Sequence, residues 1–279
     1  MSFTASIHPF LTGLLQGGTE HLASLLRPGE SRFSLKSLAL IIVCGCAAYG
    51  FAIGLWRSPL QGVYVSIKMP CLIFLTLLVN GLVNGMLGQL LGAGLTFPQT
   101  YKACLTSFAL FSLIVGSLSP LGMAMALDAP PPGTPGAETW YRGVLLTHTA
   151  IIAFAGIVAN HKLLRMLQLF SGSTGAGWRT LLAWLAGNLF VGAQLSYNLR
   201  PFFGNPRLPV QFLRPDPFDG SFYESVWKLS LASLPDGRQV TLLGLLLLPL
   251  VALSLMALAV RFLVRKVRTA NPTPPPSLP

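Results

Sequence analysis

Side chains that could do chemistry are few in this sequence and are set among long apolar runs. The carboxamides Asn80, Asn84 and Gln89 lie in one such run, and Asn188 and Gln194 lie in a later one. Asn80 and Asn84 are four residues apart, which places them on one face of a helix. Buried amides are costly in lipid unless they are paired. These amides therefore either hold helices together, with Asn188 and Gln194 as partners for the first two, or line a polar substrate path.

One histidine, His148, is expected inside a membrane span. It could relay a proton or ligate a metal, yet no second ligand stands three or four residues away. A histidine hydrogen-bonded to the hydroxyl group of a Ser or Thr on another helix is the simpler interpretation. We interpret the cysteines as small buried hydrophobes that form neither a disulfide nor a zinc site; they are Cys44, Cys46, Cys71 and Cys104.

Common catalytic and nucleotide-binding motifs are missing from the sequence. The glycine-rich stretch 172–177 would need lysine at position 178 to bind phosphate as a P-loop, and Trp178 stands there. HExxH, GxSxG and paired carboxylates do not occur. The predicted spans contain no Asp or Glu, which counts against proton-coupled or cation-coupled transport. The sequence therefore predicts no catalytic residue, no cofactor and no metal site.

Membrane helices are the elements that must position these side chains. Hydrophobic residues make up 52% of the chain and charged residues 10%, and the apolar residues come in long blocks. That pattern is typical of polytopic membrane proteins. The net charge of +11 comes from basic residues spread over loops and tails. This distribution favours attraction to anionic lipid over nucleic-acid binding, so we expect an all-α bundle embedded in a lipid bilayer.

Six transmembrane helices are predicted, at about residues 37–56, 69–92, 103–127, 143–160, 179–198 and 240–260. The second is uncharged over about 36 Å, enough to cross a hydrocarbon core of about 30 Å. Small residues mark faces suited to close helix contact. Gly50 and Gly54 form a GxxxG motif in the first span, and Gly81 and Gly85 lie beside the asparagines of the second. We expect the small, polar side of the second span to face protein and not lipid.

The chain is expected to have five parts. Residues 1–36 form an amphipathic segment that lies on the membrane or docks a partner helix, and residues 37–197 form a five-helix membrane core. Residues 198–239, rich in proline and aromatic residues, form a non-cytoplasmic segment that lies back on the membrane as an anchor, caps the bundle, or closes over a substrate as a lid. Within it, residues 221–224 resemble a capping box that opens a short helix. The sixth helix (240–263) and a disordered basic, proline-rich tail (264–279) complete the chain.

The distribution of basic residues predicts the orientation of the chain. With six spans both termini lie on one side, and the short connections on that side carry most of the Lys and Arg. Both termini are therefore predicted to be cytoplasmic. Lys68 is assigned to a short loop on the opposite side.

Two stretches resemble bacterial Yip1-like membrane proteins. LLRPGESRFSL (residues 25–35) resembles the cytoplasmic approach to that family's first span, and LLGAGLTFPQTYKACLTSFALFSLI (residues 90–114) resembles the junction of its second and third spans. The positions that carry the similarity are Gly92, Phe97, Gln99, Thr100 and Ser107. The family has five spans, whereas six are predicted here. The resemblance covers the first half of the chain at most and implies a membrane protein without catalytic activity that assembles with other membrane proteins through its helices.

Three functions are compatible with these residues. A non-enzymatic scaffold or assembly factor, acting through helix contacts with other membrane proteins or with itself, agrees best with the GxxxG spacing and the amide faces. A small permease would use a polar path, lined by Asn80, Asn84, His148, Asn188 and Gln194. A membrane-embedded enzyme would depend on His148. The Ala, Gly, Leu and Arg usage suggests a bacterial inner membrane.

Overall fold

The computed structural model describes residues 12–14, 18, 24, 26, 32–131, 133–204 and 209–232. These residues form helices and connections, with no strand among them. The chain divides into two units, Met1–Ser221 and Phe222–Pro279. The first unit contains α3 (Arg32–Leu55), α4 (Pro59–Leu90), α5 (Phe97–Ser117), α6 (Ser119–Leu127), α7 (Ala137–Ser171) and α8 (Thr174–Leu199), and the described part of the second contains α9 (Phe222–Ala232).

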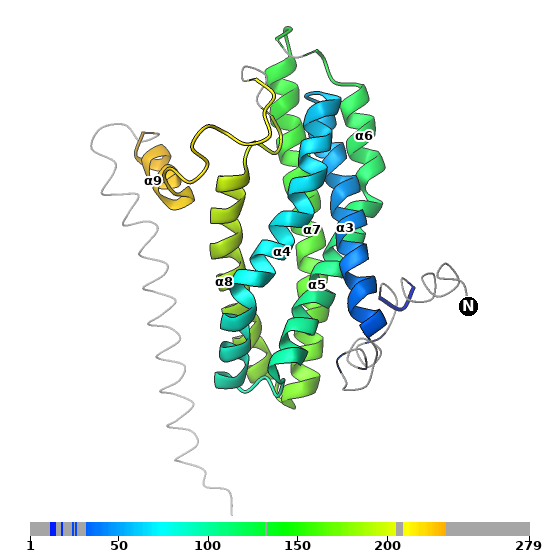
Figure 1. The fold of residues 1–279 in the computed structure, drawn as a ribbon, viewed down its shortest axis with the longest axis vertical. Helices are drawn as coiled ribbons and strands as arrows, with labels where there is room; N and C mark the ends of the chain where they lie inside the picture. Colours follow the sequence, from blue (N-terminus) through cyan, green and yellow to red (C-terminus); the bar gives the residue numbers. More distant parts are fainter. Residues whose placement is uncertain are drawn as a thin grey trace, which may run out of the picture. The chain divides into compact units, whose positions relative to one another are not determined.

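The helices of the first unit pack side by side as a bundle (Figure 1). Helix α3 lies against α4, α5 and α6, while α7 lies against α5 and α8, and α8 also packs along α4. Short connections explain why consecutive helices are neighbours. Only three residues join α3 to α4, where the Ser58 side chain accepts the Gln61 amide at 3.1 Å and Pro59 begins the helix. The short turn before α4 therefore sets where that helix begins.

The other turns in the bundle follow from local chemistry. Gly92 and Gly94, with φ of 75° and 69°, supply the left-handed conformations between α4 and α5. At the start of α5 the Gln99 side chain accepts the Thr96 amide at 2.9 Å. Helix α5 ends at Ser117, and α6 begins two residues later, at Ser119. Pro120 lies in the first turn of α6, where its missing amide hydrogen is tolerated.

Four helical stretches of the described part are long and apolar enough to cross a membrane: Leu35–Leu55, Pro59–Leu90, Phe97–Leu127 and Ala137–Ser171. The protein is thus a helical membrane protein. These stretches overlap the first four predicted spans, two of which end one or two residues later. The fifth predicted span lies in α8, which is not among the four, and the sixth lies outside the described residues. The predicted count of six is not confirmed.

Two boundaries differ from the sequence predictions. The second span was predicted to begin at residue 69 after a loop, but α4 begins at Pro59 and continues through Pro70 without ending. Lys68 therefore lies inside a helix and not in a loop, a correction that bears on the candidate site. Helix α7 extends through residue 171 because the amphipathic stretch after residue 160 continues the helix, with Leu163, Leu164 and Leu167 buried.

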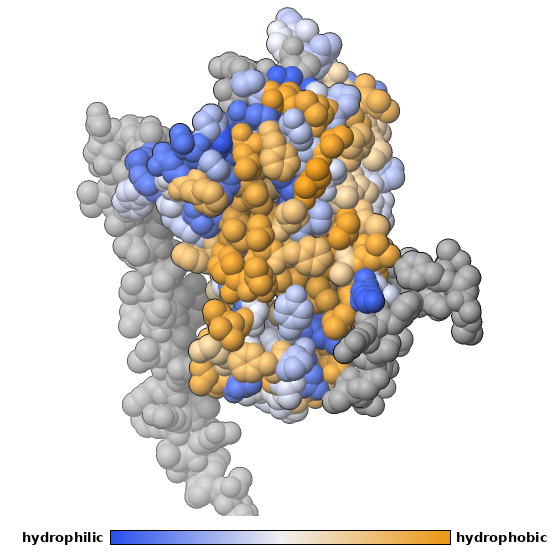
Figure 2. Space-filling model, viewed as in Figure 1, coloured by the Kyte–Doolittle hydropathy of each residue, from blue (hydrophilic) through white to orange (hydrophobic). Residues whose placement is uncertain are grey.

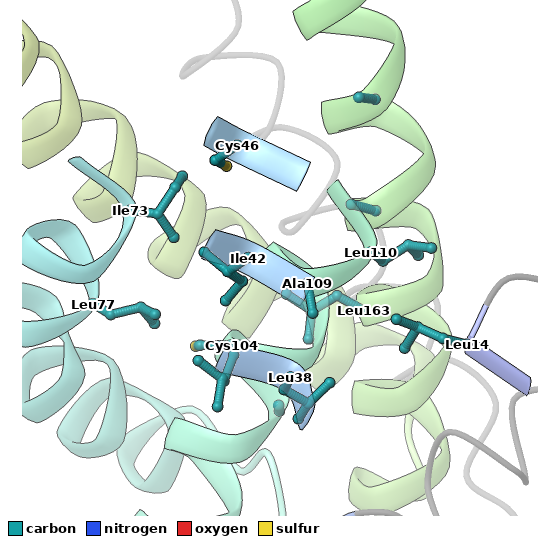
Figure 3. Close-up of a cluster of buried hydrophobic side chains, with 14 of the residues drawn as sticks. Leu14, Leu38, Ile42, Cys46, Ile73, Leu77, Cys104, Ala109, Leu110 and Leu163 are labelled. Carbon is teal, nitrogen blue, oxygen red and sulfur yellow. The ribbon is translucent and has the colours of Figure 1, made fainter. Parts of the chain in front are cut away.

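The apolar core of the first unit lies between α3, α4, α5 and α7. Figure 3 shows part of it, in which leucine, isoleucine and cysteine side chains from several helices come together. Leu14, from the otherwise largely undescribed N-terminal segment, is 1% exposed and belongs to this cluster. The Lys162 ammonium donates to the Leu14 carbonyl at 3.3 Å. The predicted interfacial helix as a whole lies outside the described residues, as do the predicted parts 240–263 and 264–279.

Glycines let α3 and α4 approach closely. A Cβ at Gly50 would lie 2.6 Å from the Val65 carbonyl oxygen, and one at Gly54 would lie 2.5 Å from the Gln61 carbonyl oxygen. Any larger residue would push the two backbones apart. The GxxxG motif thus lies in a contact within this chain. On the outside, apolar residues cover the middle of the face drawn in Figure 2, and the exposed side chains of α4 include Leu78, Leu82 and Leu90.

Candidate functional site

Three asparagines join α4 to α8 across the bundle. The Asn80 amide nitrogen donates to Asn188 Oδ1 at 3.0 Å, and the Asn84 amide nitrogen donates to the same oxygen at 3.2 Å. Asn80 and Asn84 are buried, whereas Asn188 is half-buried. Because Asn80 and Asn84 are one turn apart on α4, a single acceptor on α8 reaches both. The structure thus brings Asn188 to the two asparagines for which it was predicted to be a partner.

The other predicted residues of this site are distributed differently. Gln194 donates to Asn198 Oδ1 at 2.9 Å, one turn further along α8. Gln89 is exposed at the end of α4 and not on the face of the asparagines. The two glycines of α4 that the sequence singled out pack against aromatic rings of α5, with Gly81 next to Tyr101 and Gly85 next to Phe97. Gly81 and Gly85 therefore serve the contact between α4 and α5.

His148 lies in a second polar cluster, between α3, α6 and α7. Its Nδ1 is 2.9 Å from the Tyr49 hydroxyl, and both side chains are fully buried. Gly122 of α6 lies against the imidazole, because a Cβ there would be 2.9 Å from His148 Cε1. The Phe203 ring, with its centroid at 5.8 Å, covers another side. The predicted interhelix hydroxyl partner of His148 is therefore a tyrosine and not the Ser or Thr that we expected.

A third cluster surrounds Lys68, for which the sequence predicts a position in a loop. The Lys68 side chain is 1% exposed, and its ammonium donates to the Pro201 carbonyl at 2.8 Å. The ammonium also lies over two aromatic rings, 5.8 Å from the Phe202 centroid and 5.0 Å from the Phe212 centroid. Carbonyl dipoles and aromatic faces both attract a cation in a low-dielectric setting. These contacts offset part of the cost of burying the charge.

The carbonyl group that binds Lys68 belongs to the segment that comes after α8, here called the post-α8 segment (residues 200–204 and 209–221). Gln61 of α4 donates to the Pro201 and Phe202 carbonyls at 3.1 and 3.2 Å. Trp56 donates its indole hydrogen to the Phe203 carbonyl at 2.6 Å. The segment is therefore fastened over the turn between α3 and α4 by three side chains that sequence reasoning did not select.

One signal in the sequence could have located this cluster. Gln61 and Lys68 are seven residues apart, so they share a helical face if the helix begins at Pro59. A serine followed by proline is a common helix start. Extending the second span back to Ser58-Pro59 would have placed a lysine inside it, and an intramembrane lysine is a functional-site hypothesis by default.

No metal centre is indicated in the part of the chain that the structure describes, where no three His, Cys, Asp or Glu residues are grouped to hold an ion. Two of the cysteines differ from the predicted environment, because Cys44 and Cys71 are exposed on the surface of the bundle. Cys46 and Cys104 are buried as predicted, and all four are free thiols.

Comparison with known proteins gives no match, whether to protein-family models, to curated proteins or to solved structures. The resemblance to Yip1-like proteins stays a prediction. The chemistry of the three clusters is accordingly the basis for proposing a function.

Proposed function

We propose that this protein is a non-enzymatic membrane scaffold or assembly factor that works through helix contacts. The observation that carries the proposal is the asparagine cluster, in which the side-chain amide nitrogens of Asn80 and Asn84 both donate to Asn188 of α8. Interhelix hydrogen bonds of this kind hold membrane helices together. The Tyr49 hydroxyl likewise hydrogen-bonds His148, and the Pro201 carbonyl of the post-α8 segment accepts from Lys68. The polar groups in the bundle thus support its internal packing.

The outer surface is then the part left for a partner. It carries exposed apolar side chains on several helices, including Leu78 and Leu82 of α4, Leu146 and Ile157 of α7 and Leu189 of α8. Such side chains face lipid or another membrane helix. We propose that the partner is another membrane protein or a second copy of this chain, in a bacterial inner membrane, with six spans and cytoplasmic termini. A Yip1-like assembly role agrees with this proposal.

The test is extraction in mild detergent from the native host, purification through a C-terminal affinity tag, and mass spectrometry of proteins that co-purify. A membrane protein recovered in near-equal amount supports the scaffold. Photo-crosslinking residues placed at Leu82 and at Ile157, on different helices, then identify the contacting face. Recovery of the protein alone and monomeric at every detergent condition would contradict the proposal.

A small permease is the alternative, and one observation favours it. Asn84 Oδ1, Thr100 Oγ1 and Trp184 Nε1, on α4, α5 and α8, are buried without a hydrogen-bond partner in the described part of the chain, as expected of groups that bind a polar solute. Gln194 and His148 bond elsewhere. The path would therefore follow the asparagines and not all five residues first selected. Uptake by proteoliposomes of a panel of small neutral solutes tests this alternative. An enzyme based on His148 is the third possibility.

A further inference from the structure

The contact between α4, α5 and α8 is built in layers one helical turn apart. In one layer the Asn84 amide nitrogen lies 3.2 Å from Asn188 Oδ1 and 3.9 Å from the Cys104 sulfur. In the next layer Gly88 faces Thr100 and Trp184, because a Cβ at Gly88 would be 3.6 Å from Thr100 Oγ1 and 3.1 Å from Trp184 Cζ2. We call this set of eight residues the polar seam: Asn80, Asn84, Gly88, Thr100, Cys104, Trp184, Gly187 and Asn188.

Several polar atoms of the seam have no hydrogen-bond partner among the residues that the structure describes. They are Asn84 Oδ1, Thr100 Oγ1 and Trp184 Nε1, and the three side chains are 2%, 0% and 1% exposed. A buried polar atom without a hydrogen bond is strongly destabilising, so native structures nearly always satisfy such atoms. The three atoms come from three different helices and lie in adjacent layers. They point to a ligand that forms hydrogen bonds within the seam.

Space for such a ligand exists in front of Gly187. A Cβ built there would lie 3.8 Å from Asn80 Oδ1 and 3.9 Å from Asn84 Oδ1, which is ordinary van der Waals contact. A methyl-sized group therefore fits against both oxygens without a clash. The two amide nitrogens already donate to Asn188. The unpaired Asn84 oxygen thus borders this space, and a hydrogen-bond donor placed there can reach it.

We propose that the polar seam binds ordered water. The unpaired groups include an acceptor (Asn84 Oδ1), a donor (Trp184 Nε1) and a hydroxyl that can be either (Thr100), and water matches such a mixed, neutral set. Buried water typically forms about three hydrogen bonds to groups of this kind. A molecule of one heavy atom also suits a methyl-sized space. This water site is independent of the proposed scaffold function, because it concerns only the interior of the bundle.

The wild-type protein provides the first test, through radiolytic hydroxyl labelling in detergent. Bound water generates radicals in place, so a buried thiol beside it is oxidised faster than one in a dry site. Cys104 contacts Asn84 in the seam, whereas Cys46 is equally buried and is 3.1 Å from the Ser112 hydroxyl outside it. We expect Cys104 to be labelled several-fold faster than Cys46. Equal labelling of the two thiols would overturn the proposal.

Substitution of Gly187 provides the second test. Gly187→Ala occupies the space sterically but offers no hydrogen bond, and Gly187→Ser adds a hydroxyl. The matched control is Gly156→Ala in α7, where a Cβ meets nothing within 4 Å. We expect Gly187→Ala to lower Tm and to reduce Cys104 labelling several-fold relative to the control, with Gly187→Ser restoring part of Tm. Should Gly187→Ala raise Tm as Gly156→Ala does and leave Cys104 labelling unchanged, the seam is dry. If the alanine variant does not fold, the two thiols of the wild type decide.

Discussion

Replacing Asn188 by leucine is the sharpest test of the link between α4 and α8. The change removes two hydrogen bonds, those donated by Asn80 at 3.0 Å and by Asn84 at 3.2 Å. Interhelix hydrogen bonds in membranes average about 0.6 kcal/mol each, which gives about 1 kcal/mol for the pair. If nothing replaces the acceptor the loss is larger, about 1–3 kcal/mol for each of the two buried amide groups. We expect a net loss of about 2 kcal/mol, between these limits.

Thermal unfolding in detergent measures this loss. For a chain of this size about 2 kcal/mol corresponds to a fall in Tm of roughly 4–8 °C. The control is Thr149→Val, which also removes a polar group, one that bonds only the Leu145 carbonyl of its own helix at 2.7 Å. The triple variant with leucine at positions 80, 84 and 188 should recover most of the stability, because no amide is then left unpaired. A Tm for Asn188→Leu equal to that of the control, or a triple variant less stable than the single one, would refute the reasoning.

Three further substitutions test the other contacts. Gly54→Ala should destabilise the protein by about 1–3 kcal/mol, because its Cβ meets a backbone carbonyl of α4, and Gly156→Ala, measured by the same thermal unfolding, should not. Lys68→Met removes the bond to the post-α8 segment, so hydrogen exchange of residues 200–204 should become faster while that of α7 is unchanged. Equal exchange of residues 200–204 in the wild type and the variant would show that the lysine does not hold the segment in place. Tyr49→Phe leaves His148 Nδ1 buried without its partner and should lower the stability by about 1–3 kcal/mol. In a His148→Phe background the same change should cost much less, and a double-mutant cycle measures the difference.

The predicted helices came from local properties of the sequence. A long apolar run crosses a membrane wherever it occurs, because backbone groups in lipid must bond within the same segment. Four of the predicted spans accordingly coincide with apolar helices of the structure. The residue spacing also placed Asn80 and Asn84 on one helical face, and the amides of the fifth predicted span, Asn188 and Gln194, were the predicted partners. Asn188 accepts from both asparagines, because a buried amide in lipid requires another polar group, whereas Gln194 donates to Asn198.

The boundaries of the helices and the environment of each side chain depended on packing. Lys68 was assigned to a loop because a charge is expensive in a membrane, and nothing nearby in the sequence indicates the carbonyl group that receives it. That carbonyl belongs to a residue far along the chain, since Lys68 and Pro201 are separated by 133 positions. Tyr49 and His148 are separated by 99. Contacts over such distances depend on which helices become neighbours.

The sequence by itself thus determined that this is a helical membrane protein, and it left pairing between helices and a polar path as the two roles of its interior amides. Composition and periodicity suffice for that, because each helix satisfies its own backbone. Only the tertiary structure decided that the post-α8 segment folds back onto Trp56, Gln61 and Lys68. It likewise decided that Gly187 leaves a space before the asparagine oxygens. Both depend on the positions of separate helices relative to one another, which are fixed by the packing of side chains from the whole bundle.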